Sequence, residues 1–183
     1  MELHAELDAI AAAAAAHAGS GEALSGVLPT EPEPDCRVYL CSFEGPEARS
    51  WLALDSDGRP LRERGLVRAA VSIAALCELA EEAAGGGHLE ELRSELLTLR
   101  LTENPEGIEE AEEAAFELER TIGAPPRLAT PAHLDAIGAA TRRLEQALGE
   151  VTASPFGAAM QQAMAVVGDL ESDVLGGYKL ELS

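Results

Sequence analysis

With 183 residues, of which 46% are hydrophobic, the chain is long enough to bury a substantial core within a single domain. Aromatic residues make up only 3% of the sequence, so the core must be filled by aliphatic residues and Ala, which favours packed helices over a β-sandwich. The formal net charge of -20 and the pI near 4.4 argue against polyanionic partners, so we expect binding to neither nucleic acid nor a membrane surface.

The first segment, residues 1–18, is predicted to be a helix because apolar residues recur in it at helical spacing, namely Leu3, Leu7, Ile10 and Ala14. Its apolar stripe is narrow, so we expect it to dock either on the rest of the chain or on a second copy. Residues 19–35 are predicted to be an acidic, proline-rich linker. Prolines alternate with acids in residues 30–35, which disfavours a helix or a central strand and favours an extended, solvated chain.

Residues 36–183 are predicted to form one α-rich domain that opens with a β-hairpin over residues 36–55. The runs 36–43 and 49–55 are rich in β-branched and aromatic residues for this chain, and the stretch between them is short enough for a hairpin connection. Residues 178–182 alternate apolar and charged side chains. We therefore predict that they pair with the hairpin and complete a small antiparallel sheet.

The segment 65–84 is the longest stretch with almost no polar side chain on any side of a helical projection, and only Ser72 interrupts its apolar residues between 69 and 77. A surface helix instead shows one apolar stripe and one charged face. We therefore predict a buried central helix over residues 66–84, ended by the glycines at 85–87, around which the other helices pack.

Further helices are predicted over residues 88–101, 105–122, 131–148 and 155–175, each with an apolar stripe along one face. The last three begin with a capping residue followed by proline: Asn104-Pro105, Thr130-Pro131 and Ser154-Pro155. Short connections between such stripes indicate a bundle. The predicted fold class is α+β and predominantly α, a helical bundle around the buried central helix with a small antiparallel sheet made by the hairpin and the C-terminal strand.

The chain contains three cysteines, an odd number, which is typical of a protein from a reducing compartment. Cys36 and Cys41 lie an odd number of positions apart, so on a strand they point to opposite faces and cannot bond to each other. Acidic residues near the N-terminus indicate that the alanine run 11–16 is not a signal sequence, and apolar runs are shorter than the roughly 20 residues of a membrane helix. We therefore expect a cytoplasmic protein.

Motifs of common enzyme classes are missing from the sequence. It has no Cys-x-x-Cys or histidine pair for zinc, no pair of Glu-x-x-His motifs for a di-iron bundle, and no Gly-x-Ser-x-Gly. No residue is therefore predicted to be catalytic. Cys77, within the predicted central helix, is interpreted as a small buried hydrophobic residue.

Two pairs of acidic residues are candidates for a metal site. Each pair has i,i+4 spacing and so shares one helix face, and the residues are Glu78 with Glu82, and Asp169 with Asp173. If their helices are neighbours, these carboxylates converge on Mg²⁺. Residues 77–84 and 170–175 resemble the acidic metal-binding helices of the all-α nucleotide pyrophosphohydrolases, although lysines for the phosphates are missing. This resemblance implies Mg²⁺-dependent hydrolysis of nucleotides, whereas the alternative interpretation is ordinary charge at helix ends.

Arginines are clustered just before and within the start of the predicted central helix. We predict that Arg62, Arg64 and Arg68 bind an anion or an acidic segment of a partner. The competing interpretation is that they pair with acids of the same chain. Positive charge at the N-terminal end of a helix opposes the favourable arrangement of the helix dipole, so it needs compensation or a function.

The function favoured by the sequence is a non-enzymatic, acidic protein-interaction or scaffold domain that self-associates. We expect a homo-oligomer or another protein as its partner, formed through the N-terminal helix or an exposed sheet edge, and no cofactor. One alternative is the all-α, Mg²⁺-dependent nucleotide phosphohydrolase, and the other is an anion-binding module.

Overall fold

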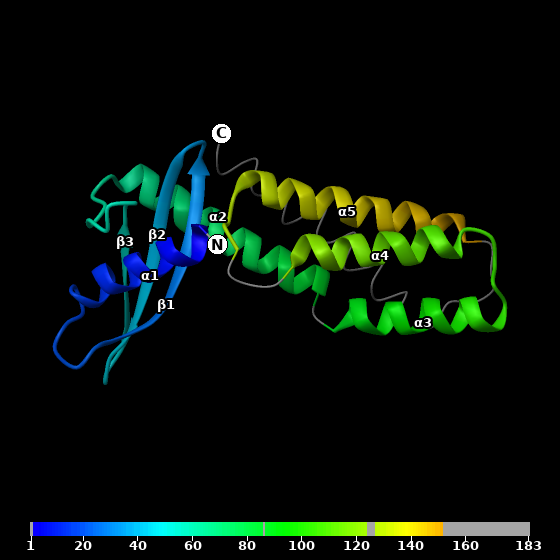
Figure 1. Ribbon diagram of the computed structural model, residues 1–183, viewed down its shortest axis with the longest axis horizontal. Coiled ribbons are helices and arrows are strands. Elements are labelled where there is room, and N and C mark those ends of the chain that lie inside the picture. The colour runs from blue at the N-terminus through cyan, green and yellow to red at the C-terminus, as the bar shows by residue number, and fades with distance from the viewer. Residues whose placement is uncertain (1, 86, 124–126, 152–183) are drawn as a thin grey trace. The chain divides into compact units, whose positions relative to one another are not determined.

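The computed structural model describes residues 2–85, 87–123 and 127–151, and over these it is an α+β protein of helices and a three-stranded antiparallel sheet (Figure 1). It divides into two compact units. The first unit is Met1–Ala75 with Ala124–Pro131, and the second unit is Leu76–Gly123 with Ala132–Ser183. None of the described helices combines the length and the apolarity needed to cross a bilayer.

The sheet of the first unit has the order β1-β2-β3, with β1 at Ala23–Glu33, β2 at Cys36–Glu44 and β3 at Arg49–Leu54. The predicted hairpin is confirmed, because β2 and β3 pair in antiparallel register. Strand β1 occupies the other side of β2. The predicted C-terminal strand, residues 178–182, and the predicted helix 155–175 lie outside the described residues.

The prediction of a solvated linker over residues 19–35 is wrong, because most of this segment is β1. Thr30 is fully buried, and its Oγ1 donates a hydrogen bond to the Val38 carbonyl at 2.8 Å. Prolines are tolerated here because β1 is an edge strand, where a missing N–H breaks no ladder bond. The carbonyl of Pro29 accepts a bond from the Ala129 N–H at 2.9 Å, and the Glu31 N–H donates to the Ala129 carbonyl at 2.8 Å.

Helix α1, Glu2–Ala15, packs on one face of this sheet. Its buried residues Ile10 and Ala14 belong to the same apolar cluster as alternate sheet residues: Tyr39, Cys41, Phe43 and Leu54. The residues between these point to the opposite face, where Val38 and Ala53 pack with Ala70 of helix α2. The first unit is therefore a sheet between α1 and the beginning of α2.

Helix α2, Arg64–Gly85, forms over the segment predicted as the central helix. Its burial on all sides is not confirmed. One face is buried at Ala70, Ile73, Cys77, Ala80 and Ala84, whereas the side chain of Val71 is 36% exposed and that of Leu79 is 50% exposed. The helix thus has an inner and an outer face, and the outer face is simply rich in apolar residues.

The second unit is built from the end of α2 and from α3, His88–Thr102, α4, Ile108–Ile122, and α5, Pro131–Glu150. The predicted stripes are buried in each of the last three helices, as at Leu92, Leu118 and Leu144. The predicted start of α4 is wrong. Asn104 has a φ of 44° and follows the end of α3, and the N-cap of α4 is Gly107 with a φ of 86°.

Candidate interaction surface

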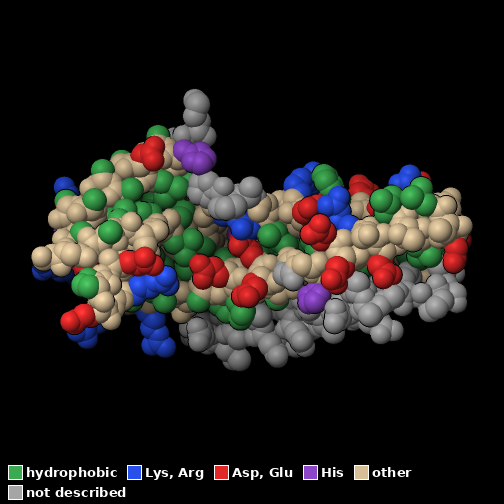
Figure 2. Space-filling model, turned by 90° about the horizontal axis from the view of Figure 1, so that it is seen from below, with side chains coloured by type: hydrophobic (Ala, Val, Ile, Leu, Met, Phe, Trp, Pro, Cys, Tyr) green, Lys and Arg blue, Asp and Glu red, His purple; other side chains and the backbone are tan. Residues whose placement is uncertain are grey.

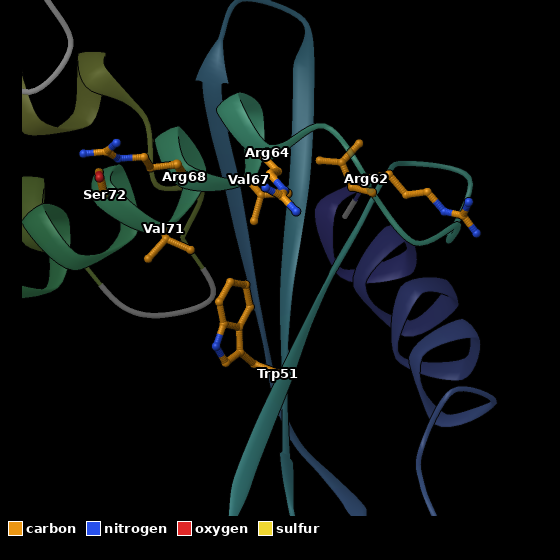
Figure 3. A pocket seen from close by; sticks show the side chains of 8 residues that line it. Trp51, Arg62, Arg64, Val67, Arg68, Val71 and Ser72 are labelled. Atoms are coloured by element: carbon orange, nitrogen blue, oxygen red, sulfur yellow. The ribbon is translucent and has the colours of Figure 1, made fainter.

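A surface cleft of about 450 Å³ lies in the first unit (Figure 3). Its lining combines apolar side chains with the arginines that the sequence singled out, and the residues are Trp51, Leu61, Arg62, Arg64, Val67, Arg68, Val71 and Ser72. The structure therefore brings the predicted anion-binding or partner-binding residues together with an apolar surface.

Local geometry explains why these side chains meet. Trp51 is two residues from Ala53, so both point to the sheet face on which α2 packs. Ala53 is buried, whereas Trp51 is 57% exposed. On α2 the i,i+4 spacing aligns Arg64 with Arg68, and it aligns Val67 with Val71 in a neighbouring row. One wall of the cleft is thus apolar and its rim is basic.

The cleft arginines are unmatched within the described part of the chain. Arg37, Arg49 and Arg59 of the same unit each have a carboxylate oxygen within 4.0 Å, at Glu6, Glu44 and Asp57 respectively. In contrast, no described acid lies within that distance of Arg62, Arg64 or Arg68, and the first turn of α2 contains no acidic residue. The competing interpretation was that these arginines pair with acids of the same chain. The described residues contain no such pair.

The arginines do not converge on one point. In Figure 3 the guanidinium groups of Arg62 and Arg68 point to opposite sides, with Arg64 between them. A compact anion such as phosphate is best held by groups that surround it, whereas a row of separated charges matches an extended acidic chain. The geometry therefore favours a partner segment over a small anion.

Strand β3 presents a partly open edge beside the cleft. Its end is covered, because the Leu61 N–H donates to the Ala53 carbonyl at 2.8 Å and the Asp55 N–H donates to the Arg59 carbonyl at 2.9 Å. Backbone groups alternate along a strand, so the N–H and C=O of Trp51 point to the same side as the Ala53 carbonyl, away from β2. Among the described residues, no backbone hydrogen bond from outside the sheet occupies the N–H or the C=O of Trp51. The other edge, at β1, carries prolines and is paired with Ala129.

The predicted metal ligands are only partly described. Glu78 and Glu82 are exposed on α2, whereas Asp169 and Asp173 lie outside the described residues. Within the described ranges, no three residues of the types His, Cys, Asp and Glu are grouped closely enough to hold a metal ion. The Mg²⁺ site therefore stays a prediction. The remaining acid of that helix end, Glu81, contacts the Nε2 of His133 at 2.9 Å.

Sequence reasoning missed Trp51, which was treated only as a strand residue. The available signals were its place on an edge strand and its alternation with Leu52, which points to the α1 face, but which part of the other face stays uncovered depends on where the beginning of α2 packs. The apolar stripe of α1, predicted to dock in cis or on a second copy, is covered in cis by the sheet.

Comparisons with protein-family models, with curated proteins and with solved structures found no match to this chain.

Proposed function

We propose that this chain is a non-enzymatic protein-interaction module that binds an extended, acidic segment of a partner in the cleft beside Trp51. The observation that supports it best is the unmatched row Arg62, Arg64 and Arg68 next to an exposed tryptophan, in a chain with a net charge of -20. Most of the molecule repels acidic partners, and Figure 2 shows acidic side chains scattered over the visible face. The cleft is where such a partner finds positive charge.

Electrostatics supports the choice of an acidic ligand. Arg62 and Arg64 lie at the start of α2, where the helix dipole is already positive, so each carries a small destabilising interaction in the free protein. A carboxylate placed across this end interacts favourably with both the guanidinium groups and the free N–H groups of the first turn. Binding of an acidic segment therefore relieves an unfavourable charge arrangement.

The apolar wall and the open strand edge support an extended ligand. A peptide that pairs with the N–H and C=O of Trp51 continues the sheet by strand addition, and its alternate side chains then reach the cleft. One aliphatic side chain against Trp51 and Val71 removes exposed apolar surface from water. The expected ligand thus alternates acidic and aliphatic residues.

Intrinsic fluorescence tests this proposal directly, because Trp51 is the single tryptophan of the chain. Titration with a short capped peptide that alternates Glu and Val should shift the Trp51 emission to shorter wavelength, and the affinity should fall as salt is raised. Replacing Arg62, Arg64 and Arg68 together by Ala should weaken binding at least about tenfold, which corresponds to about 1.4 kcal/mol.

The matched control is the double variant Arg49→Ala and Arg59→Ala, which removes surface arginines that are already paired with acids of the chain. It should bind the peptide as the wild type does. Equal binding of a Lys and Val peptide, or unchanged affinity in the triple variant, would reject the proposal. Inorganic phosphate is the third ligand to test, because binding of phosphate as tight as that of the peptide would favour the anion-binding module instead.

A further inference from the structure

Helices α3 and α4 of the second unit are joined by ion pairs along one exposed line. Arg93 Nη1 lies 2.5 Å from Glu119 Oε2, and Arg100 Nη1 lies 2.7 Å from Glu112 Oε2. The two helices pack against each other in antiparallel directions, since the residue numbers rise on one side as they fall on the other. We call this line of residues, with the apolar side chains between the pairs, the α3–α4 seam.

Apolar side chains occupy the middle of the seam. Leu97 is four residues after Arg93 and three before Arg100, and Phe116 is four residues after Glu112 and three before Glu119, so helical spacing places both between the ion pairs. Leu97 is 51% exposed and Phe116 is 54% exposed. Leu101, one turn beyond Leu97, is 77% exposed. Clustered large apolar side chains of this kind mark contact surfaces.

The charges of the seam are separated by helix. In the ion pairs of the seam α3 supplies the arginines, Arg93 and Arg100, and α4 supplies the glutamates, Glu112 and Glu119, with Glu109 adding a contact of 3.9 Å to Arg100. The seam thus has one basic side, one acidic side and an apolar centre. Such a surface is complementary to itself when it is turned about an axis that runs along the helices.

We propose that two copies of this chain associate through the α3–α4 seam, related by a two-fold axis parallel to α3 and α4. This operation places the basic side of each copy against the acidic side of the other, and it keeps each residue at its own level along the axis. Arg93 then lies between Glu119 of its own chain and the partner's Glu119, while Leu97 packs on the partner's Phe116. An axis perpendicular to the helices would instead place arginine against arginine, which is unfavourable.

The proposed surface for self-association therefore differs from the N-terminal helix and the sheet edge expected from the sequence. The N-terminal helix was one expected route, but its stripe is buried in the first unit against its own sheet. The seam uses residues that are independent of the Arg62 cleft, so failure of one proposal leaves the other standing.

Solution mass measures the association. At high micromolar concentration and about 0.15 M salt, where charges farther apart than about 8 Å are screened, light scattering should give the mass of two chains. The double variant Leu97→Ser and Phe116→Ser should weaken the dimer at least about tenfold. Leu79→Ser is the matched control, because Leu79 is 50% exposed on another helix. A monomeric wild type, or equal effects of both variants, would overturn the proposal.

Reversal of the seam charges tests the axis. A variant with Arg93→Glu, Arg100→Glu, Glu112→Arg and Glu119→Arg keeps the ion pairs within its own chain but exchanges the basic and acidic sides. It should form dimers with itself and not with isotope-labelled wild type, as measured by native mass spectrometry after mixing. Mixed dimers at or above the statistical fraction would overturn the parallel axis, and circular dichroism verifies that the variant is folded.

Discussion

The ion-paired helices of the second unit and the cleft of the first unit use their arginines in opposite ways. In the second unit Arg93, Arg100 and Arg143 are each matched by glutamates of a neighbouring helix. In the first unit the described neighbours of Arg62 and Arg64 leave both unmatched at the rim of an apolar cleft. The comparison teaches that an acidic chain can neutralise arginines internally, so a group of unmatched arginines beside an apolar cleft indicates a surface for an acidic partner.

The units also differ in how their contacts are spread along the sequence. The first unit pairs segments that are far apart, such as β1 with the region around Ala129. The second unit is made of successive helices that fold back on one another. Long-range strand pairing costs the entropy of closing large loops before its contacts stabilise the fold, whereas helix packing needs mainly local order. The following experiments test these differences, starting with the largest expected effect.

Truncating one core leucine in each unit tests whether the units are separate folding entities. Leu54 and Leu144 are at most 1% exposed, so Leu54→Ala and Leu144→Ala should each lower the free energy of unfolding by about 2–5 kcal/mol. In hydrogen exchange, Leu54→Ala should deprotect α1 and the strands first, and Leu144→Ala should deprotect α3 to α5. Leu79→Ala, at a 50% exposed position outside the α3–α4 seam, is the control. Uniform loss of protection in both core variants would show that the units unfold together.

Removing the buried hydroxyl of β1 tests whether residues 23–33 are structural. Thr30→Val should lower the free energy of unfolding by about 1–3 kcal/mol, because the buried Val38 carbonyl loses its donor at 2.8 Å. Thr98→Val removes an exposed hydroxyl that donates to the Ser94 carbonyl at 2.9 Å, and it should have little effect in urea denaturation. Equal effects of the two substitutions would indicate that β1 contributes no more than a surface segment.

Alkaline titration tests the contact between α1 and the sheet. Burial, and next a hydrogen bond to Glu6, raise the pKa of Tyr39 from 10.0 to about 12. A raised pKa in the folded state means that this stabilisation is complete below pH 10 and is lost as the pH rises towards 12. Tyr39→Phe should therefore reduce the fall in unfolding free energy over this range. Burial also raises the pKa of Cys41, to about 11, so the comparison is made between proteins that both retain Cys41. Identical pH profiles would contradict the buried position of Tyr39.

Single arginine substitutions should give the smallest effects, and effects of opposite sign for an ion-paired arginine and for a cleft arginine. Arg93→Ala should lower the free energy of unfolding by no more than about 1 kcal/mol, since its ion pair with Glu119 is largely exposed. Arg64→Ala should raise it by about 0.3–1 kcal/mol, because it removes a positive charge from the start of α2. Arg49→Ala, another exposed pair, should resemble Arg93→Ala. A loss of stability in Arg64→Ala would identify Arg64 as a structural charge.

Sequence reasoning performed differently in the two units. Helical spacing selected Leu92, Leu118 and Leu144, and all are buried in the structure. The same spacing leaves Phe116 off the predicted stripe of its helix, so its exposure follows from the pattern. In the first unit the sequence predicts the hairpin, but it predicts a linker where β1 forms, because proline is incompatible with a central strand. An edge position removes that conflict, and edges are decided by pairing with distant segments.

The sequence by itself determined the α+β class, the hairpin, the helical stripes and the cluster Arg62, Arg64 and Arg68, because local periodicity and composition encode them. Only the tertiary structure decided that Trp51 stands beside those arginines, that α1 is covered by its own sheet, and that α2 has an exposed face. Those features depend on which surfaces are left uncovered after distant segments have packed. Periodicity shows which face of an element is apolar, but what covers that face is a property of the assembled chain.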